Sequence, residues 1–192
     1  MMRLFFLLSL PLFFQACSDG DIIVTTFNFE DAKLNSCGDV GNYVFYKENT
    51  RVFESLSLKL STSDTLYRKE GISTYPLSAN TNFANYRSYD GVLGNNYFCN
   101  SIPPTYPNIQ ADYLAVSGTA DVIVTYKYDD PLPKSSGGSN DSGLNYQSRN
   151  TLKINLQIIL RDVVFVSGDK QIIQETLDMG TIENFRTIEI TP

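Results

Sequence analysis

The residues best suited to chemistry are tyrosines and asparagines that crowd one irregular region, from Tyr75 to Tyr113. A tyrosine ring offers an apolar face with a polar tip, and an amide both donates and accepts hydrogen bonds. A sugar presents a CH-lined face surrounded by hydroxyls, so this combination is typical of a glycan site. The candidate ligand-binding residues are Tyr86, Tyr89, Tyr97, Asn95 and Asn96. The alternative is that the rings simply cover one end of the folded domain.

Catalytic chemistry has few candidates in this chain. It contains no histidine, which excludes Ser-His-Asp and Cys-His nucleophilic sites, and the Gly-x-Ser-x-Gly elbow of serine hydrolases is absent. A pair of carboxylates suffices for glycoside hydrolysis when held at a suitable separation, and loop candidates are Asp90, Asp112 and Asp129. Nothing in the sequence singles out a pair. We therefore predict no catalytic residue, and a carboxylate-dependent glycoside hydrolase is the lower alternative.

Metal and cofactor sites are not predicted either. The thiols of Cys37 and Cys99, without any histidine in the chain, fall short of the four ligands of a structural zinc site. Calcium takes carboxylate and amide oxygens, but the chain has no Asp-x-Asp-x-Asp-Gly loop. Nucleic acid is also a poor partner, because the chain carries 15 Lys and Arg against 21 Asp and Glu, without the basic footprint that phosphates require.

The amino terminus has the pattern of an export signal. Arg3 precedes an apolar segment from Leu4 to Phe14, which is too short to cross a bilayer as a helix of about 20 residues, and Ala16-Cys17 follows. This stretch resembles the lipobox of bacterial lipoproteins with a type II signal peptide. The resemblance implies that residues 1–16 are removed and that Cys17 is diacylated, which supplies the two chains that stable anchoring needs.

The residues after Cys17 suggest where the anchored protein is displayed. Ser18-Asp19-Gly20-Asp21 follows Cys17, so residues 17–21 form a lipidated acidic tether. This tether is similar to the export signal of surface lipoproteins of the Bacteroidetes type. The chain as a whole resembles the β-rich surface lipoproteins of that group. The resemblance implies an outer-membrane protein held at the cell surface by its lipid anchor, with the periplasmic face as the alternative.

With Cys17 assigned to lipid, Cys37 and Cys99 remain in a compartment that permits oxidation, and we predict a disulfide between them. A loop of about 60 residues would stabilise the fold by roughly 4 kcal/mol in the chain-entropy estimate. The alternative is two buried thiols that do not meet.

Alternating apolar and polar residues predict strands throughout residues 22–192, which we expect to form a single domain. Leu56, Leu58 and Leu60 alternate with polar residues, and the same pattern recurs at 121–128 and 152–161. Further strands are expected at 22–29, 43–47, 112–117, 163–167, 171–177 and 185–190, with a hairpin at Ser167-Gly168-Asp169. A flexible Gly- and Ser-rich loop is expected near 130–147.

These elements predict an all-β, antiparallel β-sandwich, with an immunoglobulin-like topology favoured and a β-barrel as the alternative. The predicted function is that of a non-catalytic, membrane-anchored surface module that binds a glycan or another macromolecule. The alternative is a structural or assembly subunit of an outer-membrane complex, whose partner would be an outer-membrane protein.

Overall fold

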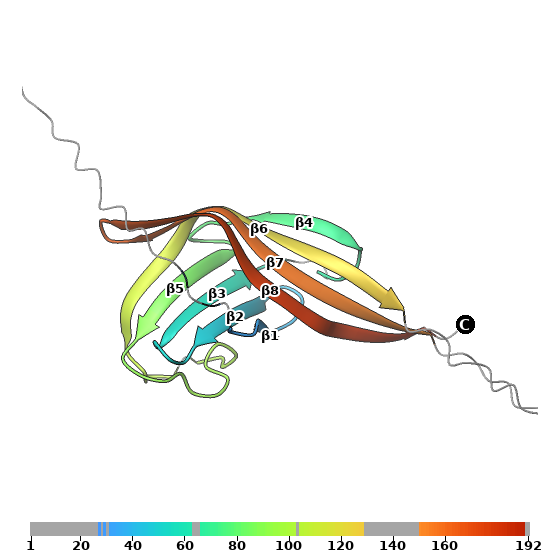
Figure 1. Ribbon diagram of the computed structural model, residues 1–192, viewed down its shortest axis with the longest axis horizontal. Helices are drawn as coiled ribbons and strands as arrows, with labels where there is room; N and C mark the ends of the chain where they lie inside the picture. Colours follow the sequence, from blue (N-terminus) through green and yellow to red (C-terminus); the bar gives the residue numbers. More distant parts are fainter. Residues whose placement is uncertain are drawn as a thin grey trace, which may run out of the picture.

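The computed structural model describes Phe27, Phe29 and residues 31–62, 66–102, 104–128 and 150–190. The predicted lipidation site Cys17 and the predicted flexible loop near 130–147 lie outside these residues, as does Asp129. The described chain is all-β and antiparallel, which confirms the predicted class (Figure 1). No helix within the described ranges is long and apolar enough to cross a membrane.

Eight strands follow one another in the described part of the chain. They are β1 (Asn35–Cys37), β2 (Tyr43–Asn49), β3 (Glu54–Leu60), β4 (Gly71–Pro76), β5 (Phe83–Tyr89), β6 (Ile109–Tyr128), β7 (Asn150–Ser167) and β8 (Lys170–Ile190). The predicted strands fall within them, except for 22–29, of which only Phe27 and Phe29 are described. The predicted hairpin is confirmed between β7 and β8, where Ser167 pairs with Lys170.

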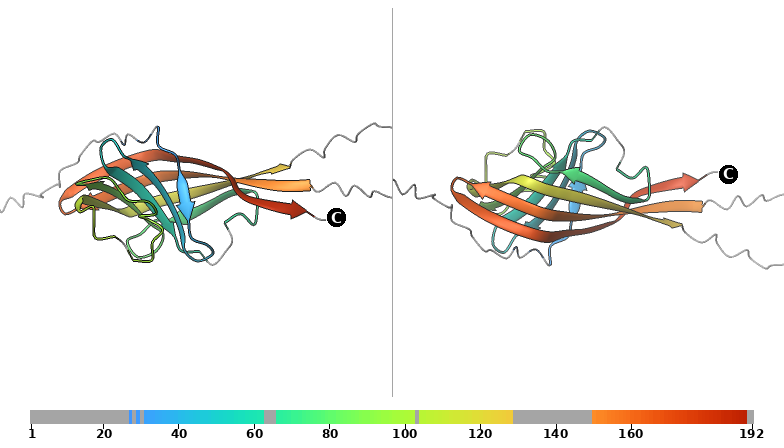
Figure 2. Two further views of the ribbon diagram at one scale, coloured as in Figure 1. Left: turned by 90° about the horizontal axis from the view of Figure 1, so that it is seen from below. Right: turned by 90° about the horizontal axis from the view of Figure 1, so that it is seen from above.

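The strands form one sheet in the order β1-β2-β3-β5-β6-β7-β8, with β4 also paired to β6. The first part of β6 pairs with β5, for example Tyr113 with Tyr86, and its later part pairs with β4, for example Asp121 with Thr74. The sheet curls into a half-barrel, and β6, β7 and β8 continue beyond it as an arm (Figures 1 and 2).

The finer prediction, a sandwich of two sheets with immunoglobulin-like topology, is not confirmed. The physical reason is the length of the last three strands, which have 20, 18 and 21 residues. The first part of β6 pairs with β5 and its later part with β4, so strands of that length join both regions into one hydrogen-bonded sheet. The described strands therefore curl as a single layer and do not separate into two sheets.

The concave face of the half-barrel holds the core. Alternate residues of β3 (Leu56, Leu58 and Leu60) face inward and are almost fully buried, as period-two patterning requires. They belong to one hydrophobic core together with the buried residues of β7. Phe27 packs edge-on against Tyr86 and Phe165, with ring centroids 4.7 and 5.6 Å apart, so the start of the described chain helps to fill the open side.

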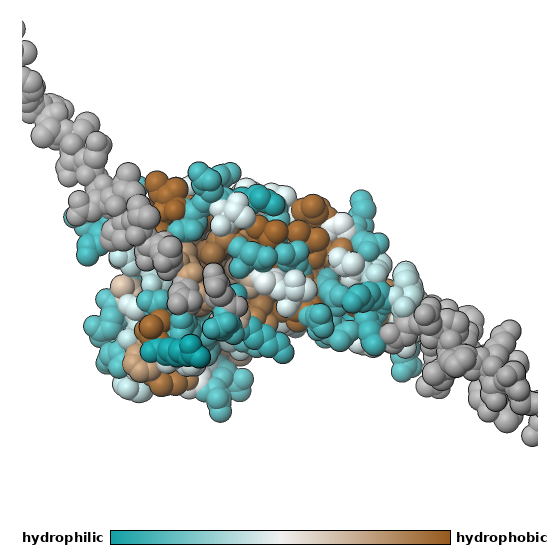
Figure 3. All heavy atoms as spheres, viewed as in Figure 1, coloured by the Kyte–Doolittle hydropathy of each residue, from teal (hydrophilic) through white to brown (hydrophobic). Residues whose placement is uncertain are grey.

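Apolar residues gather over the long strands in the space-filling view, and polar residues predominate around them (Figure 3).

Gly118 in β6 has a φ of 109° and lies where the register of β6 against β7 shifts, between Ser117 and Thr119. This β-bulge lies between the part of β6 that pairs with β5 and the part that pairs with β4.

Candidate functional site

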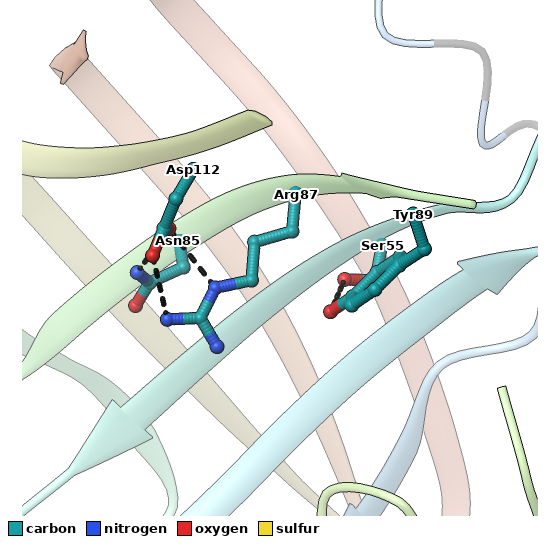
Figure 4. Close-up of polar contacts among 5 residues, drawn as sticks. All are labelled: Ser55, Asn85, Arg87, Tyr89 and Asp112. Atoms are coloured by element: carbon teal, nitrogen blue, oxygen red, sulfur yellow. Dashed lines mark hydrogen bonds and ion pairs between the residues drawn. The ribbon is translucent and has the colours of Figure 1, made fainter. Parts of the chain in front are cut away.

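The convex face of the half-barrel carries a polar cluster at the centre of the sheet. Ser55, Arg87 and Asp112 are register partners on β3, β5 and β6, so their side chains emerge on the same face (Figure 4). The Arg87 guanidinium donates from Nε and Nη2 to the two carboxylate oxygens of Asp112, each at 2.9 Å. Asn85 Nδ2 donates to the same carboxylate at 3.1 Å, and the hydroxyls of Ser55 and Tyr89 lie 3.0 Å apart.

The cluster is electrostatically matched. Burial alone would raise the pKa of the Asp112 carboxyl, but the hydrogen bonds from Arg87 and Asn85 lower it below its ordinary value. Burial opposes the charge of Arg87, yet the carboxylate of Asp112 raises the pKa of the guanidinium. Burial raises the pKa of Tyr89 to about 12. Asp112 is therefore ionised and fixed by a bidentate partner at neutral pH.

A loop after β5 packs back over this face through a chain of aromatic contacts. Tyr89 contacts Tyr97, Tyr97 contacts Phe98, and Phe98 contacts Tyr46 of β2, with centroids 5.6, 5.2 and 4.7 Å apart. Tyr89 and Tyr97 are 4% and 8% exposed, so both rings are largely enclosed by this packing. Two of the predicted glycan-binding tyrosines thus have a structural role that accounts for their burial.

Two further links hold the loop in place. At its base, the Asp90 carboxylate accepts hydrogen bonds from the backbone N–H and the side-chain amide of Asn108, at 2.8 and 2.7 Å. Near its tip, Cys99 lies at disulfide-bonding distance from Cys37 in β1, with Cα atoms 5.8 Å apart, as the sequence predicted. The loop is therefore tied to both β1 and the start of β6.

Between the loop and the sheet lies an open hollow of about 420 Å³. Its lining consists of Asn35, Tyr46, Glu48, Leu93, Gly94, Asn95 and Asn96. Asn95 and Asn96 are exposed, whereas Tyr46 and Glu48 are half-buried. Burial raises the pKa values of Glu48 and Tyr46. The site offers three amides, one carboxylate and a tyrosine within reach of a single small ligand.

The predicted ligand-binding residues are thus divided by the structure. Asn95 and Asn96 line the hollow. Tyr89 lies beneath the loop that forms one wall, and the ring of Tyr97, which belongs to that loop, packs against Tyr89. Tyr86 lies on the opposite, concave face, where it packs against Phe27, so it is not part of this site.

Sequence reasoning missed Asn35, Tyr46 and Glu48 as part of this site. The signal that could have found two of them is the alternation of β2, in which Tyr43, Phe45 and Lys47 face inward and the residues between them face outward.

The candidate carboxylates hold structure in place. Asp90 secures the base of the loop, and Asp112 is held by Arg87. No group of three or more His, Cys, Asp or Glu residues within the described part of the chain is arranged to hold a metal ion. Comparison with known proteins found no matching family model, no similar curated protein and no similar solved structure.

Proposed function

We propose that this protein is a non-catalytic lipoprotein of the outer-membrane surface, anchored through Cys17, and that its hollow on the convex face binds a glycan. The observation that carries the proposal is the composition of the hollow: Asn35, Asn95 and Asn96 surround it together with Tyr46 and Glu48. Amides satisfy the mixed donors and acceptors of sugar hydroxyls, and a half-exposed ring can cover a CH-lined sugar face.

The construction of the site supports a rigid receptor. Its walls come from two strands and from a loop that is linked to the sheet by the Cys37–Cys99 pair and by three successive ring contacts. A site held in its binding geometry loses little conformational entropy when a ligand arrives. The volume is sufficient for one or two sugar units rather than a long buried chain.

The charge of the site favours one class of glycan. Glu48 is the one charged group that lines the hollow within the described residues. A uronic acid placed there would meet a like charge, whereas a neutral sugar would meet hydrogen-bond acceptors. We therefore assign neutral or amino sugars to the site.

Affinity electrophoresis of an acyl-free form starting at Ser18, in gels that contain neutral or acidic polysaccharides, tests the proposal. The wild type should be retarded by a neutral polysaccharide. A Glu48→Ala/Asn95→Ala variant should lose about two hydrogen bonds worth about 0.5–1.5 kcal/mol each, and its dissociation constant should rise roughly 5- to 150-fold. Asn80→Ala, at an exposed asparagine outside the hollow, is the matched control.

Absence of retardation in every polysaccharide would overturn the proposed function. Equal retardation of the wild type and the double variant would show that the glycan binds elsewhere.

A second candidate is an assembly subunit, because the arm formed by the ends of β6, β7 and β8 projects from the body (Figure 2). β8 is the last strand in the order of the described sheet, so its outer edge is where another strand could add, and the side chains of Tyr128 and Ile188 on the arm are 62% and 42% exposed. Detergent extraction followed by pull-down tests this role. A partner that is lost when Ile188 is replaced by Lys would support it, and a monomer without partners would count against it.

A further inference from the structure

The convex face carries a second surface feature, which is apolar. It lies on β6, β7 and β8, close to the hairpin that joins β7 and β8. We call it the outer apolar patch. Its members are Leu114, Val116, Val164, Val166 and Ile173. The registers place them together, since Leu114 pairs with Val166 and Val164 pairs with Ile173. Val116 and Ile173 are 48% and 49% exposed.

Strand geometry fixes the direction of these side chains. Ala115, Phe165 and Ile172 alternate with them and are buried on the concave face, so the patch residues point outward. The register of β6 against β7 shifts between Ala115 and Ser117, which leaves Val116 as an extra residue. A bulge of this kind places two residues of one strand opposite one residue of its partner. Val116 is thereby added to the outward apolar surface beside Val164.

The position of the amino-terminal chain relates this patch to the anchor. The Phe27 ring lies 5.6 Å from that of Phe165, on the inner side of the same stretch of β7 whose outer side carries Val164 and Val166. Ten residue steps separate Cys17 from Phe27, and they span at most about 35 Å. From Phe165 to Leu152 near the far end of the arm, β7 rises about 43 Å. The hairpin end is therefore within reach of a membrane that holds Cys17, and it lies closer to the described start of the chain than the far end of the arm does.

We propose that the outer apolar patch lies against the surface of the lipid bilayer to which the protein is anchored. This rests on the lipidation of Cys17 in the proposed function. The adjacent hairpin carries one acid and one base, Asp169 and Lys170, and the whole chain has a net charge of −6. Attraction to anionic headgroups therefore contributes little, and burial of apolar side chains at the interface supplies the contact. The acyl chains attach the protein and the patch sets its orientation, with the arm directed away from the anchor.

The absence of tryptophan from the chain permits a direct test. An Ile173→Trp variant of the complete lipidated protein gives a single emission signal from the patch. A Val40→Trp variant is the control, because Val40 is as exposed as Val116, at 48%, and lies in the turn between β1 and β2 at the other edge of the sheet. Both are placed in phosphatidylcholine vesicles with and without brominated acyl chains.

Patch side chains that enter the interface to a depth of about 5–10 Å come close to the bromine atoms. The emission of Ile173→Trp should shift to shorter wavelength and fall to about half or less with brominated lipid, while Val40→Trp should change little. A Val116→Trp variant should behave as Ile173→Trp does, which guards against a local effect of one substitution.

The outcomes separate the two proposals. If the protein does not float with the vesicles, the anchor proposed for Cys17 fails. If it floats but the patch variants and the control are quenched equally weakly, the docking inference fails alone. A blue-shifted signal that brominated lipid does not quench would show that a second protein copy covers the patch, and it would also overturn the inference.

Discussion

Gly118 offers the sharpest test of how the long strands are bent. It lies at the bulge of β6, with a φ of 109°, and a Cβ atom built on it would meet the Arg161 carbonyl oxygen, the Val163 Cα and the Val163 Cγ2, all at 2.8 Å. The Arg161 carbonyl oxygen and the Val163 Cα belong to the backbone, so these two atoms cannot rotate away. Replacement of Gly118 by Ala therefore forces the β6 and β7 backbones apart.

Other glycines of the chain separate the two contributions to this cost. Gly41 also has a positive φ, 91°, but a Cβ there meets nothing within 4 Å. Gly94 has neither a positive φ nor a neighbour within 4 Å. Gly41→Ala therefore measures the backbone cost alone, about 1–2 kcal/mol, and Gly94→Ala should be neutral or stabilising by up to about 1 kcal/mol. Gly118→Ala adds overpacking of about 1–3 kcal/mol, which brings its cost to about 2–5 kcal/mol.

Urea unfolding followed by circular dichroism measures these three differences in the free energy of unfolding. The expected order of stability is Gly94→Ala, then Gly41→Ala, then Gly118→Ala. If Gly118→Ala cost no more than Gly41→Ala, the strands would not be in close contact at the bulge, and the account of how the sheet bends would be refuted.

Two further predictions concern polar and covalent links. In Asp121→Asn, the loss of charge-assisted bonds from Thr74 and Arg161, each at 2.7 Å, should cost about 1–3 kcal/mol at pH 7 by urea unfolding. These bonds lower the pKa of Asp121. The stabilisation they give is therefore complete above the unfolded-state pKa and is lost as the pH falls below about 4. If Asp121→Asn still lowered the free energy of unfolding by the same amount at pH 2, this account would be contradicted. The paired Cys37→Ser/Cys99→Ser variant should lose up to roughly 4 kcal/mol, since 62 residues separate the partners. The same loss should appear when a reductant is added to the wild type, whereas no change in the midpoint would argue against the link.

Most of the strand content was predictable because alternation is a local property, but β1, β4 and β5 were missed, and β5 lies inside the region that was expected to be irregular. Leu56, Leu58 and Leu60 were assigned correctly to one buried face, and the hairpin at Gly168 was placed correctly. The single curled sheet was not predictable, because it depends on whether a strand continues through a bulge. Positions such as Asp162, with a φ of 51°, and Gly180, with a φ of 103°, interrupt the pattern in the sequence while β7 and β8 continue through them.

The division of the tyrosine region shows what sequence proximity conceals. Tyr86 and Tyr89 are three residues apart, and in a strand an odd separation places side chains on opposite faces. Applied to 83–89, this rule would have assigned Tyr86 to the concave face and Asn85, Arg87 and Tyr89 to the convex face, as the structure has them. The rule could not be applied without knowing that the segment is a strand. The apolar and polar residues of 83–89 alternate only weakly, because the core buries one face of the strand and the loop covers the other. That loop is in turn held in place by a cysteine pair whose partners are 62 positions apart in the sequence, which no local pattern reveals.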